Sequence, residues 1–115
     1  MTAGAHEKHR CSFVVLYRWR LHEGMEEDFV AAWSEVTRHL RDTAGALGSR
    51  LHRGSDGLWY GYAQWPDAAA RRRAFAGAAE LPARRRMRTA IAESLPEIVL
   101  EPVADFLLVA RQSPA

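Results

Sequence analysis

Residues 12–21, SFVVLYRWRL, restrict the fold more than any other stretch of this 115-residue chain. Alternation of β-branched and aromatic residues with a period of two predicts a β-strand. One face of this strand is apolar throughout and carries Phe13, Val15, Tyr17, Trp19 and Leu21. The other face begins with Val14 and Leu16 and continues with Arg18 and Arg20. A sheet built on this strand must therefore bury one face fully and the other in part.

The next three segments follow the same logic. Residues 25–43 predict a helix, because apolar residues recur at steps of three and four and acidic residues occupy the first turn, and Gly45 should end it. Residues 47–53 and 58–65 alternate again and predict two strands. The Asp56-Gly57 pair between them is typical of a tight hairpin turn.

The second half predicts more helix and a last strand. Residues 67–79 are rich in alanine and arginine and should be helical, with Asp67 as the N-cap. Residues 82–95 predict a further helical piece that ends at Pro96. Residues 98–109 predict a long strand, in which Pro102 indicates a bulge or an edge near the beginning.

The order βαββαβ predicts an α+β, ferredoxin-like fold, in which helices cover one face of a four-stranded antiparallel sheet. We expect one domain over residues 12–110, with tails at 1–11 and 111–115. The uncovered sheet face would be half apolar, so we expect it to pack against a second copy in a homodimer. The residues expected at that interface are Leu16, Arg18, Arg50, His52, Tyr60 and Tyr62.

Composition excludes several classes. The single cysteine, Cys11, rules out an intrachain disulfide and a cysteine-based metal site. No apolar run is long enough for a membrane helix, and residues 1–10 lack the apolar core of a signal peptide, so we expect a cytoplasmic protein without a membrane partner. Residues 68–92 hold seven arginines and one acid. These arginines could bind phosphates, but without a nucleic-acid motif we interpret them as a solvated helical surface.

Three stretches resemble a known family. They are RWRLHEGMEEDF at residues 18–29, GALGSRLHR at 45–53 and YAQWPDAAA at 62–70. Together they are similar to the antibiotic biosynthesis monooxygenase family of dimeric α+β barrels, over about residues 13–108. The resemblance implies a pocket between sheet and helices and pairing of subunits sheet to sheet. It also implies that Trp65 is the pocket tryptophan at the end of a strand.

The family resemblance and the alternation of residues along the predicted strands together indicate a candidate site. We expect Tyr17 and Trp65 as catalytic residues, and a substrate pocket lined by Trp33, Leu51, Phe75 and Met87. The expected activity is a cofactor-independent monooxygenase that acts with O2 on a flat phenol, anthrone or hydroquinone. The protein would exclude water, orient the ring and supply a base or hydrogen bond, with no metal and no cofactor.

Other interpretations remain open. The chain has no asparagine, which several members use, and no histidine after His52, so the haem-degrading branch of the family is not expected. The aromatic residues could simply fill a small core. The protein could also be a ligand-binding or stress-associated dimer that performs no reaction. A plain assembly module would require the pocket to be filled by side chains.

Overall fold

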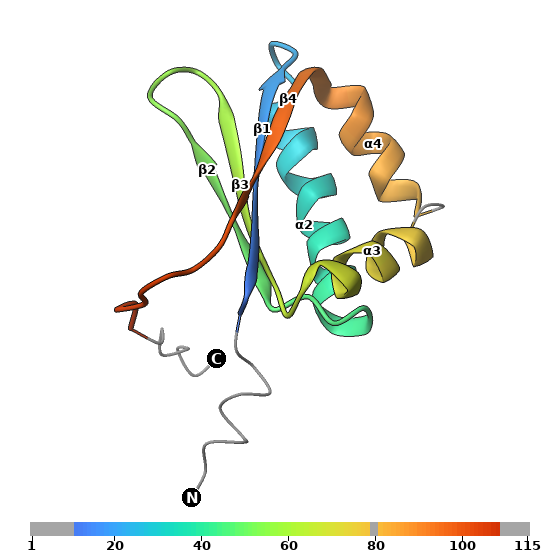
Figure 1. The fold of residues 1–115 in the computed structure, drawn as a ribbon. Coiled ribbons are helices and arrows are strands. Elements are labelled where there is room, and N and C mark those ends of the chain that lie inside the picture. The colour runs from blue at the N-terminus through green and yellow to red at the C-terminus, as the bar shows by residue number, and fades with distance from the viewer. Residues whose placement is uncertain (1–10, 79–80, 109–115) are drawn as a thin grey trace, which may run out of the picture.

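The computed structural model describes residues 11–78 and 81–108 and contains a four-stranded sheet with all its helices on one face (Figure 1). The elements are β1 (Phe13–Leu21), α2 (Glu26–Thr43), β2 (Gly48–Arg53), β3 (Trp59–Trp65), α3 (Ala68–Gly77), α4 (Pro82–Ala90) and β4 (Ile91–Leu100). The strand order β2-β3-β1-β4, with every neighbouring pair antiparallel, confirms the α+β ferredoxin-like fold. Residues 1–10 and 111–115 of the expected tails lie outside the described residues.

The register of β1 against β3 confirms the predicted faces. Phe13 pairs with Trp65, Tyr17 with Gly61 and Trp19 with Trp59, so these residues share one face of the sheet, and it is the face that packs against the helices. Gly61 is needed at its position, because an added Cβ would lie 2.9 Å from the ring of Trp19. The glycine therefore leaves room for the Trp19 ring beside β3.

The predicted bounds of α2 and of the hairpin are confirmed to within one residue. Gly45 follows α2 with φ of 84°, a conformation that favours glycine, and the next amide, of Ala46, donates to the Leu40 carbonyl. Gly57, in the hairpin turn, has φ of 87°, which also favours glycine. The Gly54 amide closes that turn on the Leu58 carbonyl at 2.7 Å.

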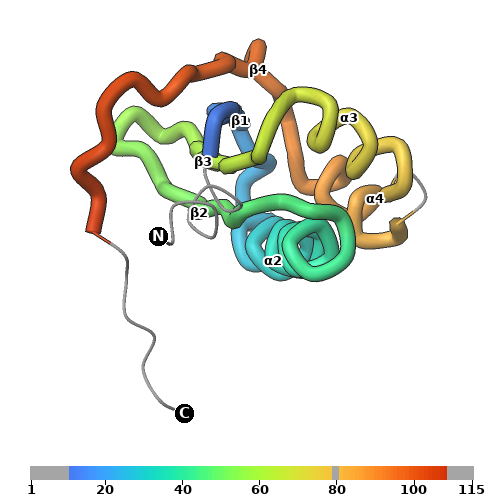
Figure 2. Tube along the Cα trace, turned by 60° about the horizontal axis from the view of Figure 1, so that its bottom comes forward, coloured from blue at the N-terminus to red at the C-terminus, as the bar shows by residue number. Residues whose placement is uncertain are grey.

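Helix α3 packs closely on the sheet because its buried residues are small. Ala70 and Ala74 are buried in the helix and Ala78 just after it, beside Val15 and Trp65. As predicted, Asp67 caps the helix, and its carboxylate accepts a hydrogen bond from the Ala70 amide at 2.8 Å. Figure 2 shows α2, α3 and α4 together on the same side of the strands.

The predicted start of the last helix at Pro82 is confirmed, but the predicted end of that helix and both ends of the last strand were wrong. Helix α4 ends at Ala90, and residues 91–95 already belong to β4, which starts opposite Leu21. Pairing with the full length of β1 outweighs the local helical preference of these residues. Pro96 lies where the register against β1 shifts, a place where a missing amide hydrogen is tolerated.

The strand also ends earlier than predicted, at Leu100 instead of Val109. Leu100 pairs with Val14, close to the beginning of β1, so few partner residues remain beyond it. Pro102 therefore follows the strand. Residues 101–108 have no regular structure and run away from the helices in Figure 1, and Val109 lies outside the described residues.

Candidate functional site

A cavity of about 240 Å³ lies between the sheet and the helices. Its floor is β1 and β3, and its walls come from α2, α3 and α4 and from the start of β4. The volume falls just below the usual range of ligand pockets, about 300–1,000 Å³. Five of the residues predicted for the site line the cavity: Tyr17, Trp33, Trp65, Phe75 and Met87. Such a space suits a small, flat, largely apolar molecule.

Tyr17 sits at this cavity with a fixed hydrogen-bond partner. Its hydroxyl oxygen accepts a hydrogen bond from Nε of Arg71 at 3.0 Å, and the guanidinium of Arg71 binds the Glu97 carboxylate at 2.8 Å. Burial raises the pKa of Tyr17 above its ordinary value, although the charge of Arg71 opposes the shift. At neutral pH the phenol is therefore protonated. Because Arg71 occupies one lone pair, the hydroxyl can donate its own hydrogen elsewhere.

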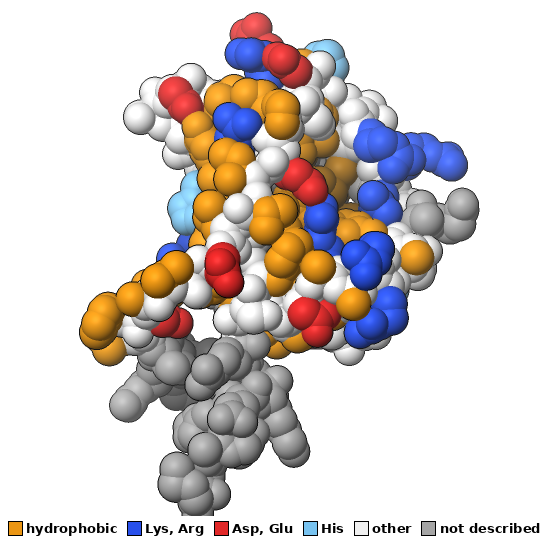
Figure 3. All heavy atoms as spheres, in the orientation of Figure 1, with side chains coloured by type: hydrophobic (Ala, Val, Ile, Leu, Met, Phe, Trp, Pro, Cys, Tyr) orange, Lys and Arg blue, Asp and Glu red, His pale blue; other side chains and the backbone are white. Residues whose placement is uncertain are grey.

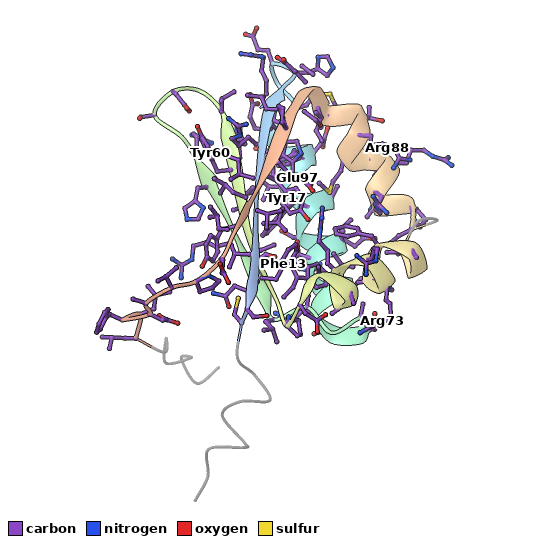
Figure 4. The ribbon with its side chains drawn as sticks, viewed as in Figure 1. Phe13, Tyr17, Tyr60, Arg73, Arg88 and Glu97 are labelled. Atoms are coloured by element: carbon purple, nitrogen blue, oxygen red, sulfur yellow. The ribbon has the colours of Figure 1, made fainter. Side chains whose placement is uncertain are left out.

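The Arg71 side chain is held by three elements at once. It belongs to α3, Tyr17 to β1 and Glu97 to β4, and Figure 4 shows Tyr17 and Glu97 between the sheet and the helices. Glu97 follows Pro96 in the register shift of β4, opposite Tyr17. A bulge changes the direction of side chains on the bulged strand. Here it brings a carboxylate to the side of the sheet on which Arg71 lies.

Phe75 is flanked by two arginines. The guanidinium carbon atoms of Arg71 and Arg84 each lie 5.2 Å from the centroid of its ring. This is within the distance at which a cation is attracted to an aromatic face. On the cavity side, the Phe75 ring contacts Trp65, with centroids 5.8 Å apart. Figure 3 shows hydrophobic side chains between β4 and the helices, bordered by arginines.

Trp65 carries an indole nitrogen without a partner. The side chain is almost fully buried, and no acceptor for its Nε1 hydrogen exists among the described residues. A buried donor without an acceptor costs about 1–3 kcal/mol. Because this nitrogen is shielded on all sides, a molecule in the cavity would meet the ring of Trp65 and not its N–H. The sequence could indicate Trp65 by its place in the strand, but not the lack of a partner.

The remaining predicted site residues lie elsewhere. Leu51 is on the helix side of β2 but packs with Trp19, Phe29 and Trp59, and it does not line the cavity. The six residues expected at a dimer interface share the opposite face of the sheet, where Leu16 and Arg50 flank Tyr62, and Arg18 and His52 flank Tyr60.

Two arginines were missed by reasoning from sequence. The interpretation as a solvated surface fits Arg72, Arg73 and Arg85, which are exposed, but not Arg71 and Arg84, which are partly buried beside aromatic rings. No local signal distinguishes them, because Tyr17 is 54 positions away from Arg71.

Other kinds of site find little support. Within residues 11–78 and 81–108, no three histidine, cysteine or acidic side chains are grouped to hold a metal ion. None of the histidines in these ranges lines the cavity; His52, for example, is exposed on the opposite face of the sheet. No helix in the described part of the chain is long and apolar enough to span a membrane.

Comparisons with known proteins agree with this architecture. An oxygenase from Streptomyces nogalater, SnoaB, described as cofactor-independent, superimposes with a TM-score of 0.67 at 22% identity, covering 90% of this chain and 97% of SnoaB. A candidate antibiotic biosynthesis monooxygenase from Bordetella bronchiseptica gives a TM-score of 0.71 at 16% identity, covering 83% of this chain and all of the other. No curated protein matches significantly by sequence. The family model described as antibiotic biosynthesis monooxygenase matches residues 12–84, more than half of the chain. The chain therefore belongs to the antibiotic biosynthesis monooxygenase family.

Proposed function

We propose that this protein is a cofactor-independent monooxygenase that oxidises a small flat phenol, anthrone or hydroquinone with O2. The observation that carries the proposal is an aromatic-lined cavity beside the hydroxyl of Tyr17, which Arg71 leaves free to donate a hydrogen bond. Flat rings fit between aromatic side chains, and the Tyr17 hydroxyl fits an oxygen atom of such a substrate.

The reaction would use the electrons of the substrate. Loss of a proton from an activated CH2 group, as in an anthrone, gives an electron-rich anion that can reduce O2. One oxygen atom then forms a carbonyl at that carbon, and the other leaves as water with both hydrogens. The substrate thus supplies all four electrons that O2 accepts. In this scheme Tyr17 binds a substrate oxygen and stabilises the negative charge that develops on it, and the ring of Trp65 packs against the substrate.

The test is oxygen uptake with anthrone or a naphthohydroquinone. We expect Tyr17→Phe to lower kcat by about 100-fold, the typical cost of removing one donor to a developing oxyanion. Trp65→Phe should weaken substrate binding, because a smaller ring then forms that wall of the cavity. Tyr60→Phe, at a tyrosine on the opposite face of the sheet that does not line the cavity, serves as the matched control and should retain kcat. Full turnover in both site variants would refute the assignment of these residues.

The main competing function is binding without turnover, since the same cavity could hold an aromatic metabolite. Saturable quenching of tryptophan fluorescence without oxygen uptake, over a panel of phenols, would favour it. The plain assembly module required the space to be filled by side chains, and the cavity argues against that interpretation.

The protein is further proposed to act as a homodimer. Among the described residues, no helix covers the outer sheet face and Arg18 Nε on that face has no acceptor. Exposed apolar side chains also occur in residues 101–108. There Phe106 is 92% and Leu108 93% exposed. Burying such a surface against a second copy would remove it from water.

Sedimentation tests the dimer. We expect a particle of twice the 12.9 kDa chain mass at micromolar concentration. Tyr62→Arg should shift it towards the monomer, because it adds a charge at the centre of the face. Val30→Arg, at an exposed position of α2, is the matched control and should leave the mass of the particle unchanged. A monomeric wild-type protein would refute the proposal.

A further inference from the structure

The charged side chains that line the cavity are all of one sign. Among the described residues that line it, the only ionisable side chains are Tyr17, Arg84 and Arg88, and there is no carboxylate and no histidine. The cavity therefore offers a substrate no strong base. A substrate that must lose a proton there would need its anion to be stabilised instead.

Arg84 is placed to stabilise that anion. Its side chain lines the cavity, is half-buried and lies over the ring of Phe75. Arg71, on the same ring, is already paired with Glu97, whereas none of the four ion pairs formed by the described residues includes Arg84. Arg88 is exposed and extends outward from α4 in Figure 4. The Tyr17–Phe75 end of the cavity thus keeps a net positive charge.

We propose that the cavity selects aromatic ligands that carry a negatively charged oxygen, such as a phenolate, and that Arg84 is the residue that attracts this oxygen. The inference rests on the proposed function and narrows its substrate class. Hydrogen bonds to charged groups are stronger than those between neutral ones, and a partly buried charge is less screened by water. We expect the phenolate to bind about 10- to 100-fold more tightly than the neutral phenol.

The experiment measures the pKa of a bound phenol. We would titrate 4-nitrophenol by its phenolate absorbance, free and in the presence of excess protein, in air and under nitrogen. A 10- to 100-fold preference for the phenolate lowers the pKa of the bound phenol by about one to two units. Arg84→Gln should abolish the shift, and Arg84→Lys should keep part of it because the charge remains. Arg85→Gln removes the same charge from an exposed neighbour and should leave the shift unchanged.

Three results would overturn the inference. They are an unshifted pKa in the wild-type protein, no binding of phenolate up to millimolar concentration, and equal loss of the shift in the Arg84→Gln and Arg85→Gln variants. A circular dichroism spectrum like that of the wild-type protein would show that Arg84→Gln folds. Because the readout needs no turnover, a shifted pKa without oxygen uptake from any substrate would refute the oxygenase proposal and support this one. Oxygen uptake without a shift in the pKa of the bound phenol would support the oxygenase proposal and refute this one.

Discussion

Replacing Gly61 by alanine tests the packing that forms the floor of the cavity. The added Cβ would lie 2.9 and 3.1 Å from two carbon atoms of the Trp19 ring and 3.7 Å from Nε1 of Trp33. The Trp19 ring has little room to move, because it stacks on Tyr17 with centroids 5.7 Å apart and meets Phe29 edge-on at 5.1 Å. Overpacking of this kind typically costs 1–3 kcal/mol.

Part of this cost is offset, because alanine reduces the conformational freedom of the unfolded chain by about 0.4–1 kcal/mol. We therefore expect Gly61→Ala to be destabilised by about 1–2 kcal/mol. For a domain near 100 residues this lowers Tm by roughly 4–16 °C, measured by circular dichroism at fixed protein concentration. Gly77→Ala is the matched control, because an added Cβ there meets nothing within 4 Å, and it should be neutral or stabilised.

Gly61 also lines the cavity, so the same variant should bind aromatic ligands more weakly. The reasoning fails if Gly61→Ala is as stable as the wild-type protein. That result would mean that the Trp19 ring shifts freely, and that the aromatic floor is not the fixed surface that this structure describes.

Three further expectations follow from individual contacts. The pKa of Tyr17 is raised in the folded state, so its contribution to stability is present below about pH 10 and is lost as the pH rises through the folded pKa. As the pH is raised, the wild-type protein should therefore begin to unfold at a lower pH than Tyr17→Phe. Identical curves of stability against pH for the two proteins would contradict this. Asp67→Ala should cost about 1 kcal/mol in urea unfolding because α3 loses its cap, whereas an unchanged midpoint would mean that the cap is replaced. A chain truncated after Leu100 loses the exposed apolar residues 103–108 and should dimerise more weakly in sedimentation, and undiminished association would exclude a role for this segment.

The local sequence pattern was sufficient to predict the elements that bury one regular face. The alternation in β1 and β3 specified which side chains meet the helices, because a one-residue slip in register would exchange the two faces. The stripe of α2 and the turn at Gly57 were equally readable, since each depends on residues close in sequence.

The boundary between α4 and β4 was not readable from local sequence. Residues 91–95 are compatible with a helix, and Pro96 resembles a helix stop. What decides their conformation is the edge of β1, whose pairing partners for these residues lie about 70 to 80 positions earlier in the chain. The role of Arg71 was hidden for the same reason, because both of its partners come from other elements.

The bulge in β4 at Pro96 and Glu97 lies in the segment whose structure was wrongly predicted, and it also determines the chemistry of the site. In a regular strand, one residue of β4 would face Tyr17, whereas here Pro96 and Glu97 share that place. On the outer face of the sheet this bulge is stabilised by the Arg18 guanidinium, which donates a hydrogen bond to the Pro96 carbonyl at 2.8 Å. On the inner side, Glu97 binds Arg71 and so fixes the donor to Tyr17. Glu97 also balances the charge of Arg71, which leaves Arg84 as the cation available to a ligand. A bulge that breaks the sequence pattern thus sets both the orientation of the Tyr17 hydroxyl and the sign of the field in the cavity.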